Sequence, residues 1–279
     1  LSSPGIVVAM TAAYASSFVL KAFAWRHYAG ARKPLHLHLA PIGYSLFVNH
    51  LLPVKAGDLV RSGLAAKLER QSWDESLHTV AVARMMDISV LLLFGACGVI
   101  ALGVEWVPGG AWVFVGLGIA GLMLALTGLH IARKRGNAFA ARQWNLLRRL
   151  WTRKALLAWI VTAVSWVLEA LVPFGVLAAL HSPVSFWEAV WVNSMTVAGQ
   201  LFHVTPGGIG TYETSMSASL AALGIGASAA LTAAVVSHAY KFAFAYAAGL
   251  LSWLILPIRM EEMTRWLSRR RIGKVGPAP

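Results

Sequence analysis

The amino-acid sequence predicts an all-α polytopic membrane protein, built as a helical bundle. Of its 279 residues, 58% are hydrophobic and only 13% are charged. Apolar runs long enough to cross a hydrocarbon core of roughly 30 Å recur along the chain, and basic residues are confined to some of the connectors between them. The predicted spans are residues 4–25, 78–102, 110–132, 155–180 and 228–257. We therefore expect a transmembrane domain over residues 1–257 and a basic tail over residues 258–279.

The distribution of basic residues predicts how these spans are oriented. The formal net charge is +13, and much of it falls in the connector 133–154 and in the tail, whereas connectors 103–109 and 181–187 contain no Lys or Arg. Cytoplasmic loops carry this excess of basic residues. We expect a protein of the cytoplasmic (cell) membrane with a cytoplasmic C-terminus. Residues 133–154 and 258–274 would contact anionic inner-leaflet lipids rather than nucleic acid.

Two apolar segments are interrupted by proline and glycine, in "LLPVKAGDLVR" (residues 51–61) and "HVTPGGIGTYE" (residues 203–213). The predicted orientations place both ends of 37–75 in the cytoplasm and both ends of 188–223 outside. This predicts two opposed re-entrant helix hairpins, as expected for an inverted repeat. The alternative is two pairs of surface helices. The turn and hinge residues are Pro53, Gly57, Pro206, Gly207, Gly208 and Gly210.

The same orientation places the start of span 4–25 outside the cell. The sequence there has no initiator methionine and no signal-like basic region. We therefore expect that an earlier span precedes this sequence in the full protein.

The two turns also predict an anion site. Helices are expected to begin near Gly57 and Thr211, and free N–H groups at a helix start attract anions. Asp58 and Glu213 fall in the first turns of these helices, where a carboxylate can cap the helix. Alternatively, these two acids face a cavity, where they read an amine or neutralise an arginine.

Ionisable residues inside spans are costly and usually face a cavity or a partner. Arg84 and Asp87 are three residues apart, so they can instead form an ion pair within one helix. Lys241 has no acid nearby in sequence, and its expected counter-charges are Glu213, Glu169 or a lipid phosphate. Lys21 is expected to reach the membrane interface.

No pattern in the sequence points to catalysis, a metal or a cofactor. The one cysteine, Cys97, lies inside a span, which excludes a disulfide framework. The nine histidines include no zinc-binding motif, and we expect His36 and His38 to be interfacial polar residues. Nucleophile-elbow and Walker sequences are also missing. We expect a protein that is not an enzyme.

Four stretches resemble the transmembrane, flippase-like region of lysylphosphatidylglycerol synthases and its stand-alone relatives, and we expect a stand-alone member without the synthase domain. They are "LKAFAWRHY", "HLLPVKAGDLVRSGLAAK", "VAVARMMDISVLLL" and "TPGGIGTYETSMSASLAALG". The resemblance implies a multi-span lipid translocase with two re-entrant segments. By position, Asp58, Arg61, Arg84, Pro206, Gly207, Gly208, Gly210 and Glu213 match the family's polar and turn positions, and Lys241 falls where a basic residue is usual.

The sequence thus predicts a translocase for a phospholipid or another polar-headgroup lipid. Arg61, Arg84 and Lys241 would hold a headgroup phosphate, while Asp58 and Glu213 would read an amine or couple transport to protons. One alternative is a non-transporting subunit that presents lipid to a membrane enzyme. Another is a membrane transferase that uses an isoprenoid-phosphate donor. A second copy of the chain is a further candidate partner.

Overall fold

Every regular element in the described part of the chain is a helix. The structure, a computed structural model, describes residues 4–52, 56–103, 123–124, 127–137, 140–141, 144–145, 152–182, 184–202, 205–259 and 261–262. Three stretches are long and apolar enough to cross a membrane: α1 (Pro4–Ala29), α4 (Trp73–Leu102), and Arg153–Ala179, which comprises α7 (Arg153–Glu169) and α8 (Leu171–Ala179). These features confirm an all-helical membrane protein.

All three stretches differ from the prediction in their bounds, and α1 continues to Ala29, past the predicted end at residue 25. The helix predicted over 78–102 begins earlier, at Trp73, because the Ser72 hydroxyl accepts a hydrogen bond from the Glu75 N–H and caps the helix. The stretch predicted over 155–180 is divided at Ala170 into α7 and α8. Pro173 explains this break, because proline has no N–H to donate to the carbonyl four residues earlier.

The other two predicted spans have different outcomes. Residues 227–255 form one continuous helix, α11 (Ala227–Ile255). It is not one of the three stretches that are long and apolar enough to cross a membrane. His238 and Lys241 make its centre more polar, so its passage across the membrane stays a prediction. Most of the span predicted over 110–132 lies outside the described residues.

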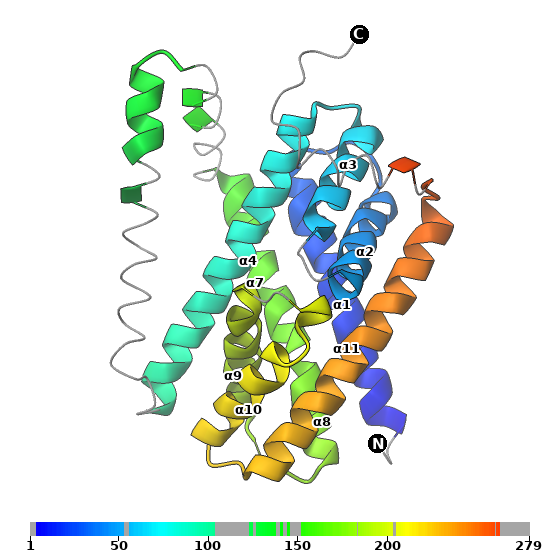
Figure 1. Ribbon diagram of the computed structural model, residues 1–279, viewed down its shortest axis with the longest axis vertical. Coiled ribbons are helices and arrows are strands. Elements are labelled where there is room, and N and C mark those ends of the chain that lie inside the picture. The colour runs from blue at the N-terminus through cyan, green and yellow to red at the C-terminus, as the bar shows by residue number, and fades with distance from the viewer. Residues whose placement is uncertain are drawn as a thin grey trace.

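The two interrupted segments form helix pairs at opposite ends of the bundle (Figure 1). One pair is α2 (Leu35–Leu51) and α3 (Gly57–Glu69); the other is α9 (Phe186–Gly199) and α10 (Thr211–Ala222). Short 3-10 turns, η2 (Gln200–Phe202) and η3 (Pro206–Gly208), join the second pair. The predicted helix starts at Gly57 and Thr211 are confirmed. η3 of the second pair contacts α2 of the first.

Glycine is required where these pairs turn. A Cβ on Gly57 would lie 2.2 Å from the Ser45 carbonyl oxygen, so α3 can approach α2 this closely only without a side chain. Gly207 has φ +61°, and a Cβ there would lie 2.2 Å from the Phe242 ring. Positive φ at Gly208 and Gly210 also agrees with the predicted glycine turn. Pro53 lies outside the described residues, and Pro206 begins η3.

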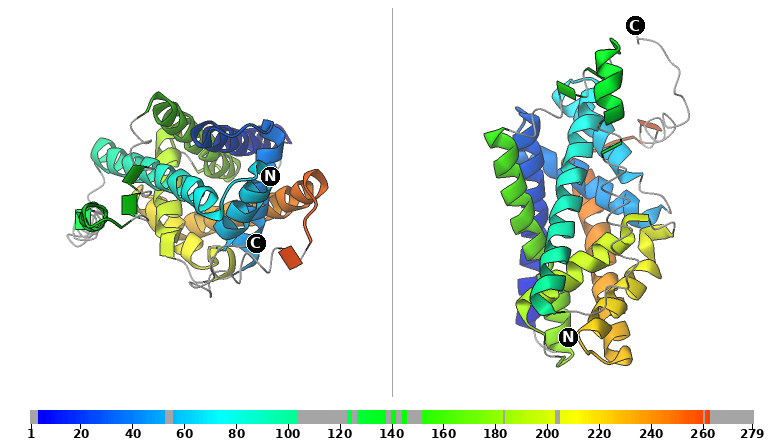
Figure 2. Two further views of the ribbon diagram at one scale, coloured as in Figure 1. Left: turned by 90° about the horizontal axis from the view of Figure 1, so that it is seen from above. Right: turned by 90° about the vertical axis from the view of Figure 1, so that its left-hand side faces the viewer.

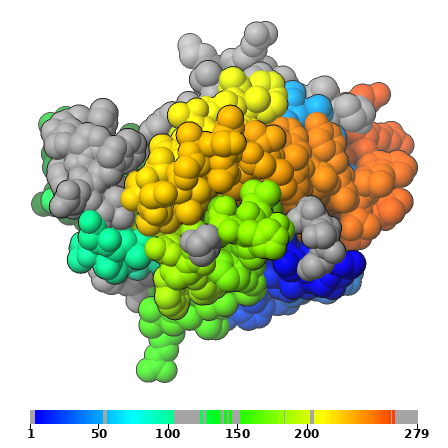
Figure 3. All heavy atoms as spheres, turned by 90° about the horizontal axis from the view of Figure 1, so that it is seen from below, coloured from blue at the N-terminus to red at the C-terminus, as the bar shows by residue number. Residues whose placement is uncertain are grey.

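The remaining helices enclose these turns. In Figure 2, α1, α4 and α7 run along the long axis of the bundle, and α11 runs beside the two pairs. Elements from the second half of the chain gather at the lower end with the start of α1 (Figure 3). Large apolar side chains on the outer faces are exposed, including Leu93, Leu156 and Leu254, as expected for surfaces that meet lipid.

We predict that Gly57→Ala lowers the free energy of unfolding by about 1–3 kcal/mol, because the added methyl group forces α3 away from the α2 backbone. Thermal unfolding in detergent would measure the change. Gly5→Ala is the control, since no heavy atom lies within 4 Å of a Cβ there. Equal unfolding temperatures for the two variants would contradict the close approach.

Candidate functional site

A cavity of about 610 Å³ lies inside the bundle, and α2, α3 and η3 from the two helix pairs contribute residues to its wall. Its volume is in the range of sites for small ligands. Its wall includes apolar side chains such as Phe18, Leu46 and Leu91. Among the described residues, it is also lined by four cations (Lys21, Arg61, Arg84, Lys241) and three acids (Asp58, Asp87, Glu169). This concentration of charge makes the cavity the candidate site, because buried ionisable groups are costly in a membrane unless they have a role.

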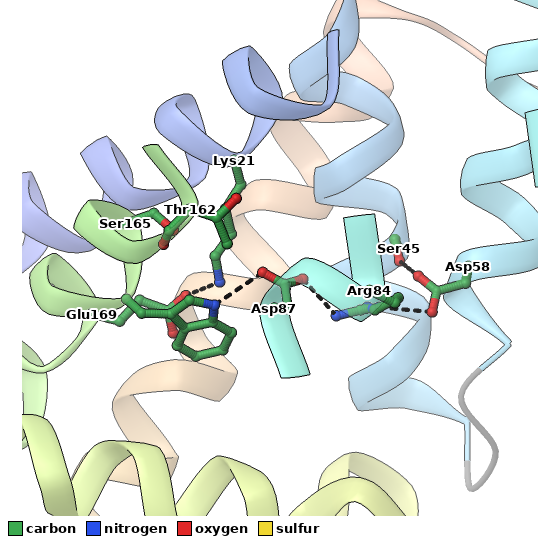
Figure 4. A network of polar contacts seen from close by, with 9 residues as sticks. Lys21, Ser45, Asp58, Arg84, Asp87, Thr162, Ser165 and Glu169 are labelled. Atoms are coloured by element: carbon green, nitrogen blue, oxygen red, sulfur yellow. Dashed lines mark hydrogen bonds and ion pairs between the residues drawn. The ribbon is translucent and has the colours of Figure 1, made fainter. Parts of the chain in front are cut away.

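Arg84 is the centre of the charged network in the cavity (Figure 4). Its Nε donates to Asp58 Oδ2 at 2.8 Å, and its Nη1 lies 3.7 Å from Asp87 Oδ2. The Ser45 hydroxyl also donates to Asp58, at 3.4 Å. The pair within α4 that the sequence left open is therefore present, but Asp58 on α3 is the closer partner. A phosphate would have to compete with two carboxylates for Arg84.

The network continues from Asp87 to the opposite wall of the cavity. Trp166 Nε1 donates to Asp87 Oδ1 at 3.0 Å, and the Lys21 ammonium lies 3.4 Å from the centroid of the Trp166 ring. Lys21 also pairs with Glu169. The expectation that Lys21 reaches the membrane interface was wrong. Lys21 turns inward because Glu169, which is only 3% exposed, provides its counter-charge there.

Arg61 is a buried cation with an unsatisfied hydrogen-bond donor. It is 5% exposed, and its guanidinium carbon lies 4.1 Å from the centroid of the Trp25 ring. Its Nε atom has no hydrogen-bond partner among the residues that the structure describes. Within the described part of the chain, no carboxylate lies within 4.0 Å of its nitrogens. Arg61 can therefore accept an anion without first losing a carboxylate.

Lys241 is a second buried cation that has no carboxylate partner in the described part of the chain. It is 5% exposed, and its ammonium donates to Asn193 Oδ1 at 3.0 Å. The rings of Tyr14 and Tyr212 lie 5.8 Å and 5.3 Å away. The acids expected to neutralise Lys241 have other partners, because Glu169 pairs with Lys21 and Glu213 contacts His238. Its contacts are neutral amide and aromatic groups.

Glu213 has the capping role that the sequence left open. Its Oε2 accepts the Gly210 N–H at 2.7 Å and so caps the start of α10. Its Oε1 lies 2.7 Å from His238 Nδ1. Glu213 is not among the residues that line the cavity. Asp58 has the other role that the sequence left open. Its carboxylate binds Arg84 and so neutralises an arginine.

The remaining sequence candidates lie away from the cavity. His36 is exposed, whereas His38 is buried and its Nε2 lies 3.3 Å from Glu69 Oε1. Cys97 is exposed on α4. No group of three or more His, Cys, Asp or Glu side chains suited to a metal occurs among the residues that the structure describes. Most of the basic tail lies outside those residues.

Sequence reasoning missed three features: the inward Lys21, the tryptophan side chains in the cavity, and the Asn193 amide that binds Lys241. Trp25 and Trp166 resemble ordinary apolar residues in the sequence, although each contacts a cation that lines the cavity. Asn193 was the one available signal, because an amide within the apolar stretch 186–199 requires a polar partner.

Residues 1–249 match the family described as "Lysylphosphatidylglycerol synthase TM region". The match includes every residue that lines the cavity. No curated protein and no solved structure matches the chain.

We predict that Lys21→Met destabilises the protein by about 3–5 kcal/mol, because it leaves the Glu169 carboxylate buried without its counter-charge. The double variant Lys21→Met/Glu169→Met should recover most of this loss. Lys67→Met is the matched control: Lys67 is 54% exposed in its pair with Glu262, so its loss should cost less than about 1 kcal/mol. Equal effects of the two single variants on thermal unfolding would contradict the buried pair.

Proposed function

We propose, from the premise that this chain belongs to the lysylphosphatidylglycerol synthase TM region family, that it is a lipid translocase. It moves a phospholipid or another polar-headgroup lipid between the leaflets of the cell membrane. The observation that carries this proposal is an internal cavity with two buried cations, Arg61 and Lys241, that have no carboxylate partner in the described part of the chain.

A headgroup phosphate suits these two cations. An uncompensated buried charge destabilises a fold, and an anion that enters the cavity removes this penalty. Arginine binds phosphate oxygens through its rigid set of N–H donors, and Arg61 has a free Nε in this position. Lys241 provides a compact charge at the end of a flexible side chain. In the translocase, Arg61 and Lys241 hold the phosphate, and Arg84 organises the wall through its two carboxylates.

The two helix pairs give the headgroup a route across the membrane. We interpret α2–α3 and α9–α10 as re-entrant hairpins from opposite sides, related as an inverted repeat, with the C-terminus in the cytoplasm. Irregular backbone at membrane depth needs protein or water around it. Gly207, which lines the cavity, meets this requirement. The headgroup crosses between the hairpin turns while the acyl chains stay in lipid beside the apolar outer faces of the helices.

The basic segments keep their predicted role in this proposal. Residues 133–154 and 258–274 contact anionic lipids of the inner leaflet, which attract clusters of Lys and Arg. This contact anchors the cytoplasmic end of the bundle and requires no contribution from the cavity.

We predict that Arg61→Gln and Lys241→Met each slow lipid translocation tenfold or more, because each removes a charge-assisted contact with the phosphate, worth about 1.5–3 kcal/mol. The assay follows dithionite reduction of fluorescent phosphatidylglycerol in proteoliposomes. Lys67→Met, which removes one positive charge outside the cavity, should transport at the wild-type rate.

Wild-type rates equal to those of empty vesicles, across several phosphate-bearing headgroups, would overturn the translocase proposal. Lipid that copurifies without any translocation would favour a lipid-presenting subunit instead. If all three variants slowed transport equally, the effect would be one of overall charge, and the cavity would not be the site.

A further inference from the structure

The His238 ring is held between two hydrogen-bond acceptors. Its Nδ1 lies 2.7 Å from Glu213 Oε1, and its Nε2 lies 3.1 Å from the Gly207 carbonyl oxygen. The ring is 3% exposed and stacks on Tyr212, with centroids 4.2 Å apart and planes 14° apart. Phe242 packs near it at a centroid distance of 4.8 Å. The ring is therefore fixed with one nitrogen toward each acceptor.

These contacts require one proton more than a neutral histidine and an ionised glutamate contain. An ionised carboxylate and a backbone carbonyl only accept hydrogen bonds, and a neutral imidazole has a single N–H. Both bonds form only if His238 is an imidazolium beside a carboxylate, or if Glu213 is a carboxylic acid that donates to a neutral ring. The number of bound protons is the same in both cases. We infer that Glu213 and His238 together form a proton-binding site.

Loss of this proton would weaken the attachment of η3 to α11. The one N–H that remains on the ring then stays with the ionised Glu213 carboxylate, the stronger acceptor, and the lone pair of Nε2 faces the Gly207 carbonyl oxygen. The Gly207 carbonyl would keep only a long contact of 3.5 Å from Gln200 Nε2. Since Gly207 and His238 both line the cavity, release of the proton frees a turn at the headgroup site.

This position makes the proton a coupling ion, an inference that rests on the proposed translocase function. Lys241, which holds the phosphate in that proposal, lies one turn along α11 from His238. Proton binding fixes the turn beside Lys241, and proton release loosens it. Tyr212 and Glu213 from α10 contact the ring. Other titratable groups that line the same cavity include His50 from α2, Tyr14 and Lys21 from α1, Glu169 from α7, and Lys241. Of these, Glu213 is the group that hydrogen-bonds the ring among the described residues.

The variant Glu213→Gln can keep the same hydrogen bonds without the extra proton. The new amide can accept the Gly210 N–H and donate to Nδ1 of a neutral His238, whose Nε2–H then donates to Gly207. Every contact is satisfied without the extra proton. The matched control is Glu188→Gln on α9. Glu188 occupies the same position in a capping box, where its Oε2 accepts the Ser185 N–H at 2.5 Å, and no histidine contact accompanies it.

The first test measures thermal unfolding in detergent between about pH 5 and about pH 8, where histidine sites titrate. At low pH, wild type and Glu213→Gln have the same set of hydrogen bonds. As pH rises, only wild type can lose the proton, so Glu213→Gln should gain roughly 2–4 °C relative to wild type. The difference between wild type and Glu188→Gln should stay constant. A constant difference for Glu213→Gln as well would overturn the proton site.

The second test measures transport of fluorescent phosphatidylglycerol in proteoliposomes, with equal pH on both sides. The wild-type rate should change severalfold across the same pH range, and the rate of Glu213→Gln should not. Transport by wild type that is independent of pH would overturn the coupling role while leaving the translocase intact. If transport is absent but the stability difference depends on pH, the translocase proposal fails and the proton site stands.

Discussion

The ion pair between Arg84 and Asp58 is the contact on which the rest of this bundle depends. It joins α4, which is long and apolar enough to span a membrane, to α3, the second helix of an interrupted pair. Through Asp87 and Trp166, the same arginine is connected to α7, where Glu169 pairs with Lys21 of α1. Because isolated charges are costly inside a membrane, each member of this network requires the others. The network therefore connects α1, α3, α4 and α7 around the cavity.

Two further cations of the cavity follow a different rule. Arg61 and Lys241 are buried like Asp87 and Glu169, but their closest contacts are aromatic rings and a neutral amide. Such contacts stabilise a cation less than a carboxylate does. The cavity thus contains a network of paired charges and two cations that are available to an anion. This division separates the charges that hold the bundle together from those we assign to the lipid phosphate.

Backbone conformation and close packing at the two turns also shape this site. Gly57 allows α3 to approach α2, and Gly207 packs against Phe242 with a positive φ. The α10 start is capped by Glu213 from its own first turn, so its N–H groups are partly used. In our account, the second turn is therefore important chiefly for its attachment to His238 rather than as an anion site.

Local features of this protein could be predicted from the sequence, and partners distant in the chain could not. Helix starts at Gly57 and Thr211 follow from the turn residues, and three apolar stretches follow from hydropathy. The Lys21–Glu169 pair joins residues 148 positions apart. A lysine near a helix end is equally compatible with an interface position, and only the packing of α1 against α7 decides between them. Asn193 and Lys241 likewise meet only after α9 and α11 have packed.

The most direct test of the central claim is to identify the lipids that remain bound to the purified protein. Mass spectrometry would compare lipids retained in mild detergent with the bulk lipids of the host membrane. We predict enrichment of one phosphate-bearing headgroup class in wild type, and its loss in Arg61→Gln/Lys241→Met. A lipid profile that matches the host membrane in both proteins would contradict the assignment of these two cations to a headgroup phosphate.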